Sequence, residues 1–465
     1  MASEMNLKSF IDEQISGDWG KPEEILYNNN LVYCIRGADI NDVNLGVYHK
    51  LPKRFIHESK LKGLLRNGDL VIEISGGSPS QSTGRVAFIS NDDKRLICSN
   101  FCRGLRIKVD QNSKYYYYLL KNIYNSNIFF NFESKTSGIK NLLFDTAFEN
   151  IKVKKRDLLS QQKIASVLSA LDDKIELNSK INAELEAMAK TLYDYWFVQF
   201  DFPDVDNKPY KSSGGEMIYN EVLKRDIPKG WEVSVFNDWV AKTKTGDWGR
   251  EEIEGNYTER VYCVRGADIN GLNGKGEVKA PERYILKSNL SKTLRPNDFI
   301  IEISGGSPVQ STGRIALLTE ATFERFESNV ICSNFCKAIS LKDEKYVFNF
   351  LQEWKRLYNA NVFFSFEGKT SGIKNFLYDS FMDTYRIVKP AKDIAENYYS
   401  YVQSLENKKQ SNLKQNQQLA SLRDWLLPML MNGQVKVAGA DEEVVRELGM
   451  VAEDPVSYNV CNDEI

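Results

Sequence analysis

The chain has 465 residues, more than a single hydrophobic core usually serves, so we expect two or three domains. It has 42% hydrophobic and 27% charged residues, a net charge of −2 and no apolar run near the roughly 20 residues of a membrane helix, which excludes a membrane protein. No basic segment leads into an apolar stretch at the start, so the sequence predicts a cytoplasmic protein whose seven cysteines stay reduced.

An internal repeat organises the chain. Five segments of the first half, residues 18–20, 32–41, 71–85, 98–102 and 135–141, recur in the second half as residues 247–249, 261–270, 300–314, 332–336 and 369–375. The offset is 229 for the first three segments and 234 for the last two, because the second copy carries a five-residue insertion. The chain is therefore a tandem duplication of about half its length.

Each copy opens with predicted strands. Residues 69–74 and 85–89 are short runs rich in β-branched and aromatic side chains, and Gly, Ser, Pro and Asn bound them. These features are typical of strands joined by turns. We therefore expect a mostly β domain at the start of each copy.

A long helix follows each β domain. Residues 160–196 contain no Pro and no Gly, and one stripe of positions recurs at alternating steps of four and three. At about 1.5 Å per residue this predicts a helix of about 55 Å with a heptad seam. The seam positions are Ile164, Leu168, Leu171, Ile175, Asn178, Asn182, Leu185, Ala189 and Leu192 in the first copy, and Tyr398, Val402, Leu405, Lys409, Asn412, Asn416, Leu419, Arg423 and Leu426 in the second.

Two asparagines occupy matched seam positions in both helices. A heptad stripe alone usually indicates a helix that lies on the core of its own domain. A buried seam asparagine costs stability unless it pairs with another polar group, and such a pair fixes register. The matched asparagines therefore favour helices that are partners of each other, antiparallel around a pseudo-twofold axis.

The order of β domain, long helix, β domain and long helix resembles the specificity subunit of type I restriction-modification systems. Residues 161–165, 171–175 and 195–197 are similar to the central conserved region of that family, and residues 226–232 to the opening of a recognition domain. The resemblance extends to about residue 437. The position of Trp231 corresponds to Ala2 in the first copy, so the first domain either begins differently or borrows packing from the C-terminal segment.

The resemblance implies an α+β fold with two mostly-β target recognition domains, each followed by a long helix, and with the two helices paired as an antiparallel coiled coil. The expected segments are target recognition domain 1 (1–152), a central conserved helical region (153–200), a linker with target recognition domain 2 (201–388), a distal conserved helical region (389–436) and an acidic tail (437–465). We expect the tail to be mobile, or to form a short helix on a partner at 442–448. Without it, 60 basic and 55 acidic residues remain, a net charge of +5 that permits DNA binding.

The partners implied by the resemblance are double-stranded DNA, two methyltransferase subunits docked on the helices and added restriction subunits. No catalytic motif is apparent in the chain itself. Residues 206–210 lack the second proline of an Asp-Pro-Pro-Tyr methyltransferase segment, no Gly-x-x-x-x-Gly-Lys phosphate loop occurs, and Asp69 with Glu73 lacks the lysine of a nuclease pair. We therefore expect a non-catalytic subunit without a cofactor. The alternatives are a stand-alone bipartite DNA-binding protein and a coiled-coil structural adaptor without a DNA role.

Two loops in each copy concentrate the residue types that contact phosphates and base edges. The alternative for each loop is a tight structural turn, and Arg36 and Arg265 could instead pair with Asp39 and Asp268. The candidate DNA-binding residues are Arg36, Ser78, Gln81, Ser82, Thr83, Arg85, Lys135, Thr136, Ser137 and Lys140 in the first copy, and Arg265, Ser307, Gln310, Ser311, Thr312, Arg314, Lys369, Thr370, Ser371 and Lys374 in the second. Because these loops are almost identical, we expect a near-palindromic target whose half-sites lie about one DNA turn apart.

The repeated cysteines raise the possibility of a metal site. Cys34, Cys98 and Cys102 recur as Cys263, Cys332 and Cys336, but three thiolates need a fourth ligand, and neither histidine of the chain, His49 or His57, has a counterpart in the second copy. We therefore expect buried cysteines that act as small apolar residues, and no metal.

Overall fold

The computed structural model describes residues 4–76, 81–91, 93–136, 139–305, 309–370 and 373–437, and only the backbone of residues 135, 136, 369 and 370. The acidic tail and its expected helix at 442–448 lie outside this part of the chain. Two compact units are present, residues 1–176 with 419–465 and residues 177–418, so each unit holds one end of each long helix. The boundaries of the five expected segments stay a prediction. Within the described ranges no helix is both long and apolar enough to cross a membrane.

The first unit contains a complete β domain. Its elements are β1 (Glu4–Asn6), β2 (Ile11–Ser16), β3 (Asn30–Ile35), α1 (Ile40–Asn44), β4 (Lys53–Ile56), β5 (Leu70–Glu73), β6 (Ser75–Gly76), β7 (Val86–Phe88), β8 (Leu96–Cys98), β9 (Cys102–Ile107), α2 (Ser113–Asn125), β10 (Glu133–Thr136), β11 (Ile139–Leu142), α3 (Phe144–Asn150) and β12 (Lys152–Lys154). A four-stranded antiparallel sheet, β2-β9-β5-β7, forms the centre. Smaller sheets have the orders β4-β3-β8, β10-β11-β6 and β1-β12.

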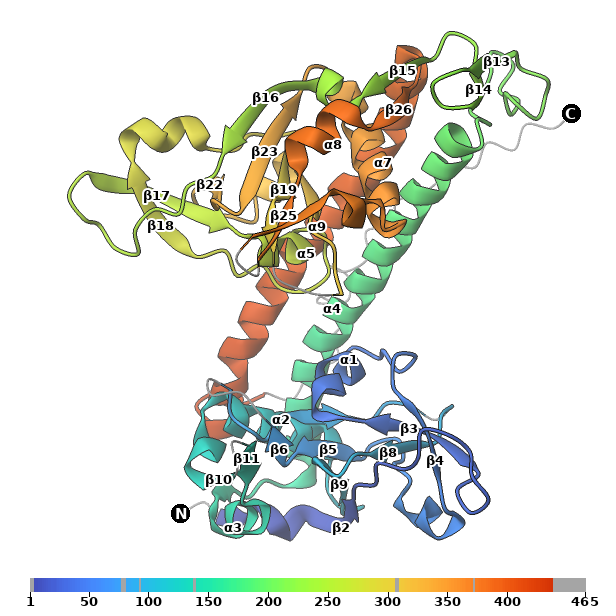
Figure 1. Cartoon of the computed structure of the whole chain (residues 1–465). Helices are drawn as coiled ribbons and strands as arrows, with labels where there is room; N and C mark the ends of the chain where they lie inside the picture. The colour runs from blue at the N-terminus through green and yellow to red at the C-terminus, as the bar shows by residue number, and fades with distance from the viewer. Residues whose placement is uncertain are drawn as a thin grey trace, which may run out of the picture. The chain divides into compact units, whose positions relative to one another are not determined.

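Strand β5 is buried on both faces, which explains its unbroken apolar run. Leu70 and Ile72 join the core under α2, whereas Val71 joins a second core cluster on the opposite face. Helix α2 begins where the side chain of Asn112 accepts a hydrogen bond of 2.8 Å from the backbone N–H of Tyr115, and it packs against β7. Figure 1 shows α2 together with the strands β5 and β9 of this domain. The β domain therefore has its core between the central sheet and the helical segments.

The first domain borrows packing from the C-terminal helix. Leu427, Leu430 and Met431 belong to the same buried cluster as Leu7 and Phe10. The guanidinium of Arg156 also donates hydrogen bonds to the carbonyl oxygens of Leu430 and Met431, at 2.7 and 3.0 Å. The first copy has no counterpart of Trp231, and the prediction that its domain borrows packing from the C-terminal segment is therefore confirmed.

The second unit repeats the first domain element by element. Its elements are β13 (Met217–Asn220), β14 (Arg225–Pro228), β15 (Glu232–Val235), β16 (Val240–Thr245), β17 (Tyr257–Val264), α5 (Ile269–Leu272), β18 (Glu282–Leu286), β19 (Asp298–Glu302), β20 (Ser304–Gly305), β21 (Ile315–Leu318), α6 (Glu320–Phe323), β22 (Asn329–Cys332), β23 (Cys336–Leu341), α7 (Val347–Asn359), β24 (Glu367–Thr370), β25 (Ile373–Phe376), α8 (Tyr378–Thr384) and β26 (Arg386–Lys389). The sheets β16-β23-β19-β21, β18-β17-β22, β20-β25-β24 and β15-β26 match those of the first unit. The hairpin β13-β14 and helix α6, which lies in the insertion, distinguish the second copy.

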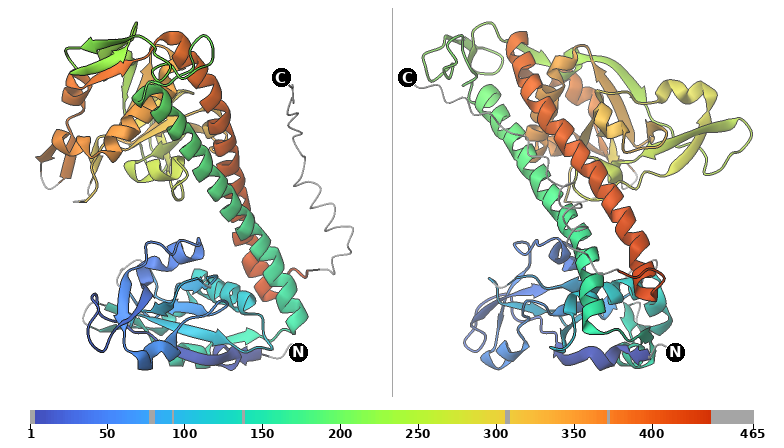
Figure 2. Two further views of the ribbon diagram at one scale, coloured as in Figure 1. Left: turned by 90° about the vertical axis from the view of Figure 1, so that its right-hand side faces the viewer. Right: turned by 180° about the vertical axis from the view of Figure 1, so that it is seen from behind.

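The two long helices are α4 (Leu158–Tyr193) and α9 (Lys392–Asn432), and they lie side by side in both views of Figure 2. Helix α4 passes into a π-helical turn at Asp194–Val198, whereas α9 continues through Pro428 to Asn432. The predicted pairing of seam asparagines is confirmed. Asn178 donates to the side-chain oxygen of Asn416 at 2.8 Å, and Asn412 donates to that of Asn182 at 2.9 Å. Because the partner number falls as the α4 number rises, the helices are antiparallel.

Asp172 of α4 contacts both the other long helix and the first β domain. Its carboxylate lies 2.7 Å from the guanidinium of Arg423 on α9 and accepts a hydrogen bond of 2.7 Å from the hydroxyl of Tyr118 on α2. Both charged side chains are about one-fifth exposed. Asp172 therefore ties the first β domain and both helices together.

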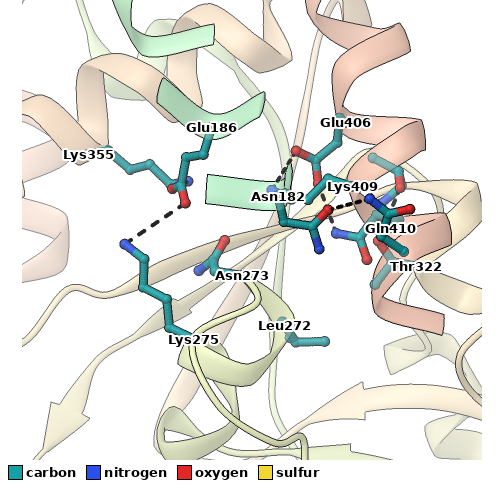
Figure 3. A network of polar contacts seen from close by, with 12 residues as sticks. Asn182, Glu186, Leu272, Asn273, Lys275, Thr322, Lys355, Glu406, Lys409 and Gln410 are labelled. Carbon is teal, nitrogen blue, oxygen red and sulfur yellow. Dashed lines mark hydrogen bonds and ion pairs between the residues drawn. The ribbon is translucent and has the colours of Figure 1, made fainter. Parts of the chain in front are cut away.

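Charged side chains form several ion pairs where α4 and α9 lie within the second unit. Figure 3 shows Glu186 of α4 between Lys355 of α7 and Lys275, at 2.9 and 4.0 Å. On α9, Lys409 lies 2.6 Å from Glu406. Burial alone would raise the pKa of Glu186, but Lys355, Lys409 and Lys275 outweigh it and lower the pKa to about 2.

Candidate nucleic-acid interface

The two candidate loops of each copy meet at one small sheet. In the first unit β6, which begins the first loop, pairs with β11, which ends the second, and β11 pairs with β10. The hydroxyl of Ser75 donates to the side-chain oxygen of Asn141 across this junction. We call β6, β11 and β10, and their counterparts β20, β25 and β24, the loop sheets. Loops more than 50 residues apart in sequence thus form one site per copy.

A buried carboxylate clamps the two loops of the first unit together. Glu133 accepts hydrogen bonds from the backbone N–H and the hydroxyl of Thr83, at 2.6 and 3.1 Å. Its other oxygen lies 3.4 Å from the ammonium group of Lys140, which also donates to the carbonyl oxygen of Gln81 at 3.2 Å. Thr83 and Lys140 are buried, so both side chains position the loops.

The second unit repeats this clamp with Glu367. Thr312 donates to Glu367 through its N–H and its hydroxyl, at 2.8 and 3.2 Å. Lys374 lies 3.0 Å from Glu367 and donates to the carbonyl oxygen of Gln310 at 3.4 Å. Sequence reasoning missed Glu133 and Glu367, although both directly follow a repeated Phe at the edge of the second loop.

Arg85 and Arg314 each form an ion pair at the base of the first loop of their copy. The guanidinium of Arg85 donates twice to the carboxylate of Glu73, at 2.8 and 2.7 Å, and Arg314 does the same to Glu302, at 2.9 and 2.6 Å. The hydrogen bonds to Glu73 raise the pKa of Arg85, although burial opposes them. A Cβ added to Gly37 would lie 2.4 Å from Glu73, so this carboxylate is tightly enclosed. Each arginine is committed to a two-point pair at the base of its loop.

The backbone conformation of the first loop requires glycine at position 84 and at its counterpart, Gly313. Their φ angles of +101° and +95° lie in the region that favours glycine. A Cβ at Gly84 would also lie 2.5 Å from the ring of Phe129, and one at Gly313 would lie 2.8 Å from the ring of Phe363. The repeated Thr-Gly-Arg segment is therefore required by the turn itself.

Arg36 and Arg265 form the ion pairs that the sequence left open as their alternative. Arg36 donates to Asp39 twice at 2.7 Å, and Arg265 donates to Asp268 at 2.9 and 3.1 Å. Their side chains remain 44% and 36% exposed, which leaves part of each guanidinium accessible. Contact of these arginines with DNA stays a prediction.

The other DNA-binding candidates of the two loops differ in exposure. Gln81 and Gln310 are exposed, Ser82 is half-buried and Ser311 is buried. Ser78, Ser137, Ser307 and Ser371 lie outside the described residues, as do the side chains of Lys135, Thr136, Lys369 and Thr370. Among the described side chains of these loops, the two glutamines are therefore exposed, whereas Thr83, Thr312 and Lys140 are buried.

The six repeated cysteines are buried free thiols, as expected. Burial raises the pKa of Cys34, Cys98 and Cys102 to about 12, which keeps these thiols protonated. Within the part of the chain that the structure describes, no group of three His, Cys, Asp or Glu side chains is arranged to hold a metal ion.

Comparison with known proteins finds the same family throughout. Residues 11–187 match the Type I restriction modification DNA specificity domain. The chain is 27% identical over 439 residues to the type I restriction enzyme MjaIX specificity subunit of Methanocaldococcus jannaschii, covering 92% of this chain and 89% of that protein. It is 22% identical over 440 residues to the HindI specificity subunit of Haemophilus influenzae, covering 80% and 88%. Its fold is similar to the crystal structure of the type I restriction-modification S subunit from M. genitalium, with a TM-score of 0.50, 15% identity and coverage of 93% and 96%.

Proposed function

We propose that the chain is a type I restriction-modification specificity subunit, like the proteins that it matches, and that it selects the DNA sequence on which its partner subunits act. Each β domain reads one half of a bipartite double-stranded target. Methyl transfer and cleavage belong to partner subunits, and this chain contributes no catalytic residue and no cofactor. The complex works in the cytoplasm.

One observation carries the proposal. In both copies, two loops distant in sequence converge on one sheet, and the same Glu, Thr and Lys residues hold them there. A surface that must present base-reading groups needs such a rigid support, because misplaced donors lose their two-point geometry. The duplication preserves the support along with the exposed glutamine.

The contacts of the candidate residues sort them into two roles. Gln81 and Gln310 are exposed and carry the two-point amide that suits adenine, so we assign them to base edges. Arg85 and Arg314 are held by buried glutamates, and we assign them to support of the loops. The half-exposed Arg36 and Arg265, together with Ser82, Lys135 and Lys369, are assigned to phosphates, whereas Lys140 and Lys374 support the loops.

The helices supply the docking surfaces for two methyltransferase subunits, to which restriction subunits add. Large apolar side chains lie exposed on both helices, with Met188 on α4 at 56% and Leu422 on α9 at 45%. These two positions are related by the repeat offset of 234. Matched apolar positions, one per copy, fit two equivalent partners, because a duplicated scaffold presents the same site twice.

Methylome sequencing of a host with and without this chain, together with its methyltransferase subunit, tests the proposal. We expect one bipartite sequence to be methylated only when the chain is present, and DNA retention by the complex to weaken steeply with salt. Methylation that does not depend on the chain would refute the assignment. A stand-alone DNA-binding protein would bind the same sites with no effect on methylation, and a structural adaptor would show no salt-dependent retention.

A further inference from the structure

A repeated segment of five residues has no role in the site described so far. Residues 98–102 and 332–336 have the same sequence, Cys-Ser-Asn-Phe-Cys. The two cysteines and the serine of each segment are buried, whereas the asparagine and the phenylalanine between them are exposed. Phe101 is 55% exposed and Phe335 is 56% exposed. Most phenylalanines of the two β domains are buried or half-buried, and the exposed ones form two matched pairs, Phe101 with Phe335 and Phe130 with Phe364. An exposed phenylalanine that recurs in both copies requires an explanation.

Backbone contacts fix this turn firmly. Ser99 donates its N–H to the carbonyl oxygen of Ile35 at 2.9 Å, and Cys102 donates to that of Ser99 at 2.9 Å. A Cβ added to Gly17 would lie 1.9 Å from the carbonyl oxygen of Ser99, so the neighbouring loop touches the turn at its backbone. In the second copy, Ser333 and Cys336 make the same hydrogen bonds, at 2.8 and 2.9 Å. The exposed pair is thus presented by a rigid support.

The turn also adjoins the loop sheet directly. The carbonyl oxygen of Phe101 accepts hydrogen bonds from the N–H groups of Ile74 and Ser75, at 2.9 and 3.1 Å, and Ser75 begins β6. In the second unit the carbonyl oxygen of Phe335 accepts from Ile303 and Ser304, at 2.8 and 3.2 Å. The turn, β6, β11 and β10 therefore form one hydrogen-bonded surface that also carries both candidate loops.

We infer that Asn100 with Phe101, and Asn334 with Phe335, contact an adenine–thymine step in the major groove of each half-site. The amide of Asn100 matches the N6 and N7 positions of adenine, and the ring of Phe101 packs on the methyl group of thymine. The side chain of Asn100 forms no hydrogen bond with the other described residues, so its amide is available to a ligand. This inference rests on the proposed function and adds specificity-determining residues to it.

Base analogues test the two contacts separately in the complex of the full chain with its methyltransferase subunit. Replacing thymine by deoxyuridine, one position at a time, removes only the methyl group, and 7-deazaadenine removes only the N7 acceptor. For the unaltered complex we expect about 3- to 10-fold weaker binding at one deoxyuridine position and about 5-fold or more at one 7-deazaadenine position of the same half-site. Phe101→Ala should abolish sensitivity to deoxyuridine, and Asn100→Ala should abolish sensitivity to 7-deazaadenine.

Matched variants serve as controls. Phe335→Ala should abolish the deoxyuridine effect in the other half-site only. Val109→Ala, at a fully exposed position beyond β9, should leave the effects of both base analogues unchanged. If the Phe101→Ala complex binds DNA as tightly as the unaltered complex, the inference is overturned and Phe101 contacts a protein partner instead. If its binding weakens equally on all DNA and both analogue effects remain, the inference is also overturned and the turn contacts phosphates. An unaltered complex without sequence preference would instead refute the proposed function itself.

Discussion

Asn412 donates a hydrogen bond of 2.9 Å to the side-chain oxygen of Asn182, and both amides are buried between antiparallel helices. The relationship acts together with the pair of Asn178 and Asn416, because a register moved by one turn would leave only one asparagine of each helix opposite another. A buried polar pair of this kind contributes little net stability but excludes other registers. The pair therefore fixes which residues of α4 and α9 face each other.

Replacing one member of the pair should be costly, and replacing both should not. In Asn412→Leu the amide of Asn182 loses its partner, so we expect a loss of about 1–3 kcal/mol in the free energy of unfolding. In the double variant Asn182→Leu with Asn412→Leu, most of that loss should return, because two leucines pack as an apolar seam. Urea unfolding followed by circular dichroism measures both effects. Ala183→Leu, on the exposed face of α4, is the control, and a double variant no better than the single one would contradict the pairing argument.

The stability of the second unit should depend on pH through Glu186. Its pKa falls from an ordinary 4.5 to about 2, because Lys355, Lys409 and Lys275 outweigh the effect of burial. A carboxyl group with a lowered pKa stabilises the folded state above its unfolded-state pKa, and this stabilisation is lost as pH falls from about 4.5 to about 2.

Glu186→Gln should therefore lower stability at pH 7 by about 1–3 kcal/mol, and the difference from the unaltered chain should shrink towards pH 2. Urea midpoints measured between pH 7 and pH 2.5 give this difference directly. The exposed Glu184→Gln is the matched control and should show almost no difference at any pH. A difference that stays constant across the range would rule out the ion pair as its source.

The seam and the domain order could be predicted from the sequence because both are periodic or repeated. The heptad spacing put two asparagines in the seam of each helix and predicted that the helices pair, and the internal repeat defined two equivalent β domains. Partners within the candidate site could not be predicted in this way. Glu133 meets Thr83 only through the register of β10, β11 and β6, and nothing local in the sequence encodes that register.

Residue type alone also does not show which partner a charged side chain has inside the protein. Asp172 lies against Arg423, because a helix that packs on a β domain as well as on another helix has two buried faces. Arg85 has the chemistry of a DNA contact, yet Glu73 holds it with two hydrogen bonds. Residue type predicted the kind of interaction in both cases, and only the fold decides the partner.

Trp425 should be a main contact of one methyltransferase subunit. It is 56% exposed on α9, three residues from the exposed Leu422, so the two side chains form one apolar surface on the same helix face. Buried tryptophans at interfaces commonly contribute 2 kcal/mol or more, so Trp425→Ala should weaken assembly about 30-fold or more. Methylation should then fall at every target without a change in the sequence chosen. Co-purification and methylome sequencing measure the two effects, with Val109→Ala as the control, and an altered target sequence would contradict this role.

The near-identity of the two copies leads to the most specific prediction, which concerns the target sequence. The candidate loops differ at Ser80 against Val309 in the first loop and at no position across residues 135–141 against 369–375. The clamps beneath them are alike, with Glu133 and Glu367 each holding a threonine and a lysine. Similar surfaces on a similar support should read similar bases, and the sequence predicts a pseudo-twofold relation between the two copies. We therefore expect an interrupted, nearly palindromic sequence in the methylome.

A single substitution makes this prediction sharper. Val309 is 89% exposed and replaces the polar Ser80 of the first loop, so it should produce any mismatch between the half-sites at one base pair. Val309→Ser should make the second half-site more like the first, with a change in preference of about 1–3 kcal/mol at that position and none elsewhere. Ser80→Val should make the opposite change in the other half-site. Two unrelated half-sites, or one continuous site without a gap, would show instead that the duplicated loops are scaffold and that the bases are read by other residues.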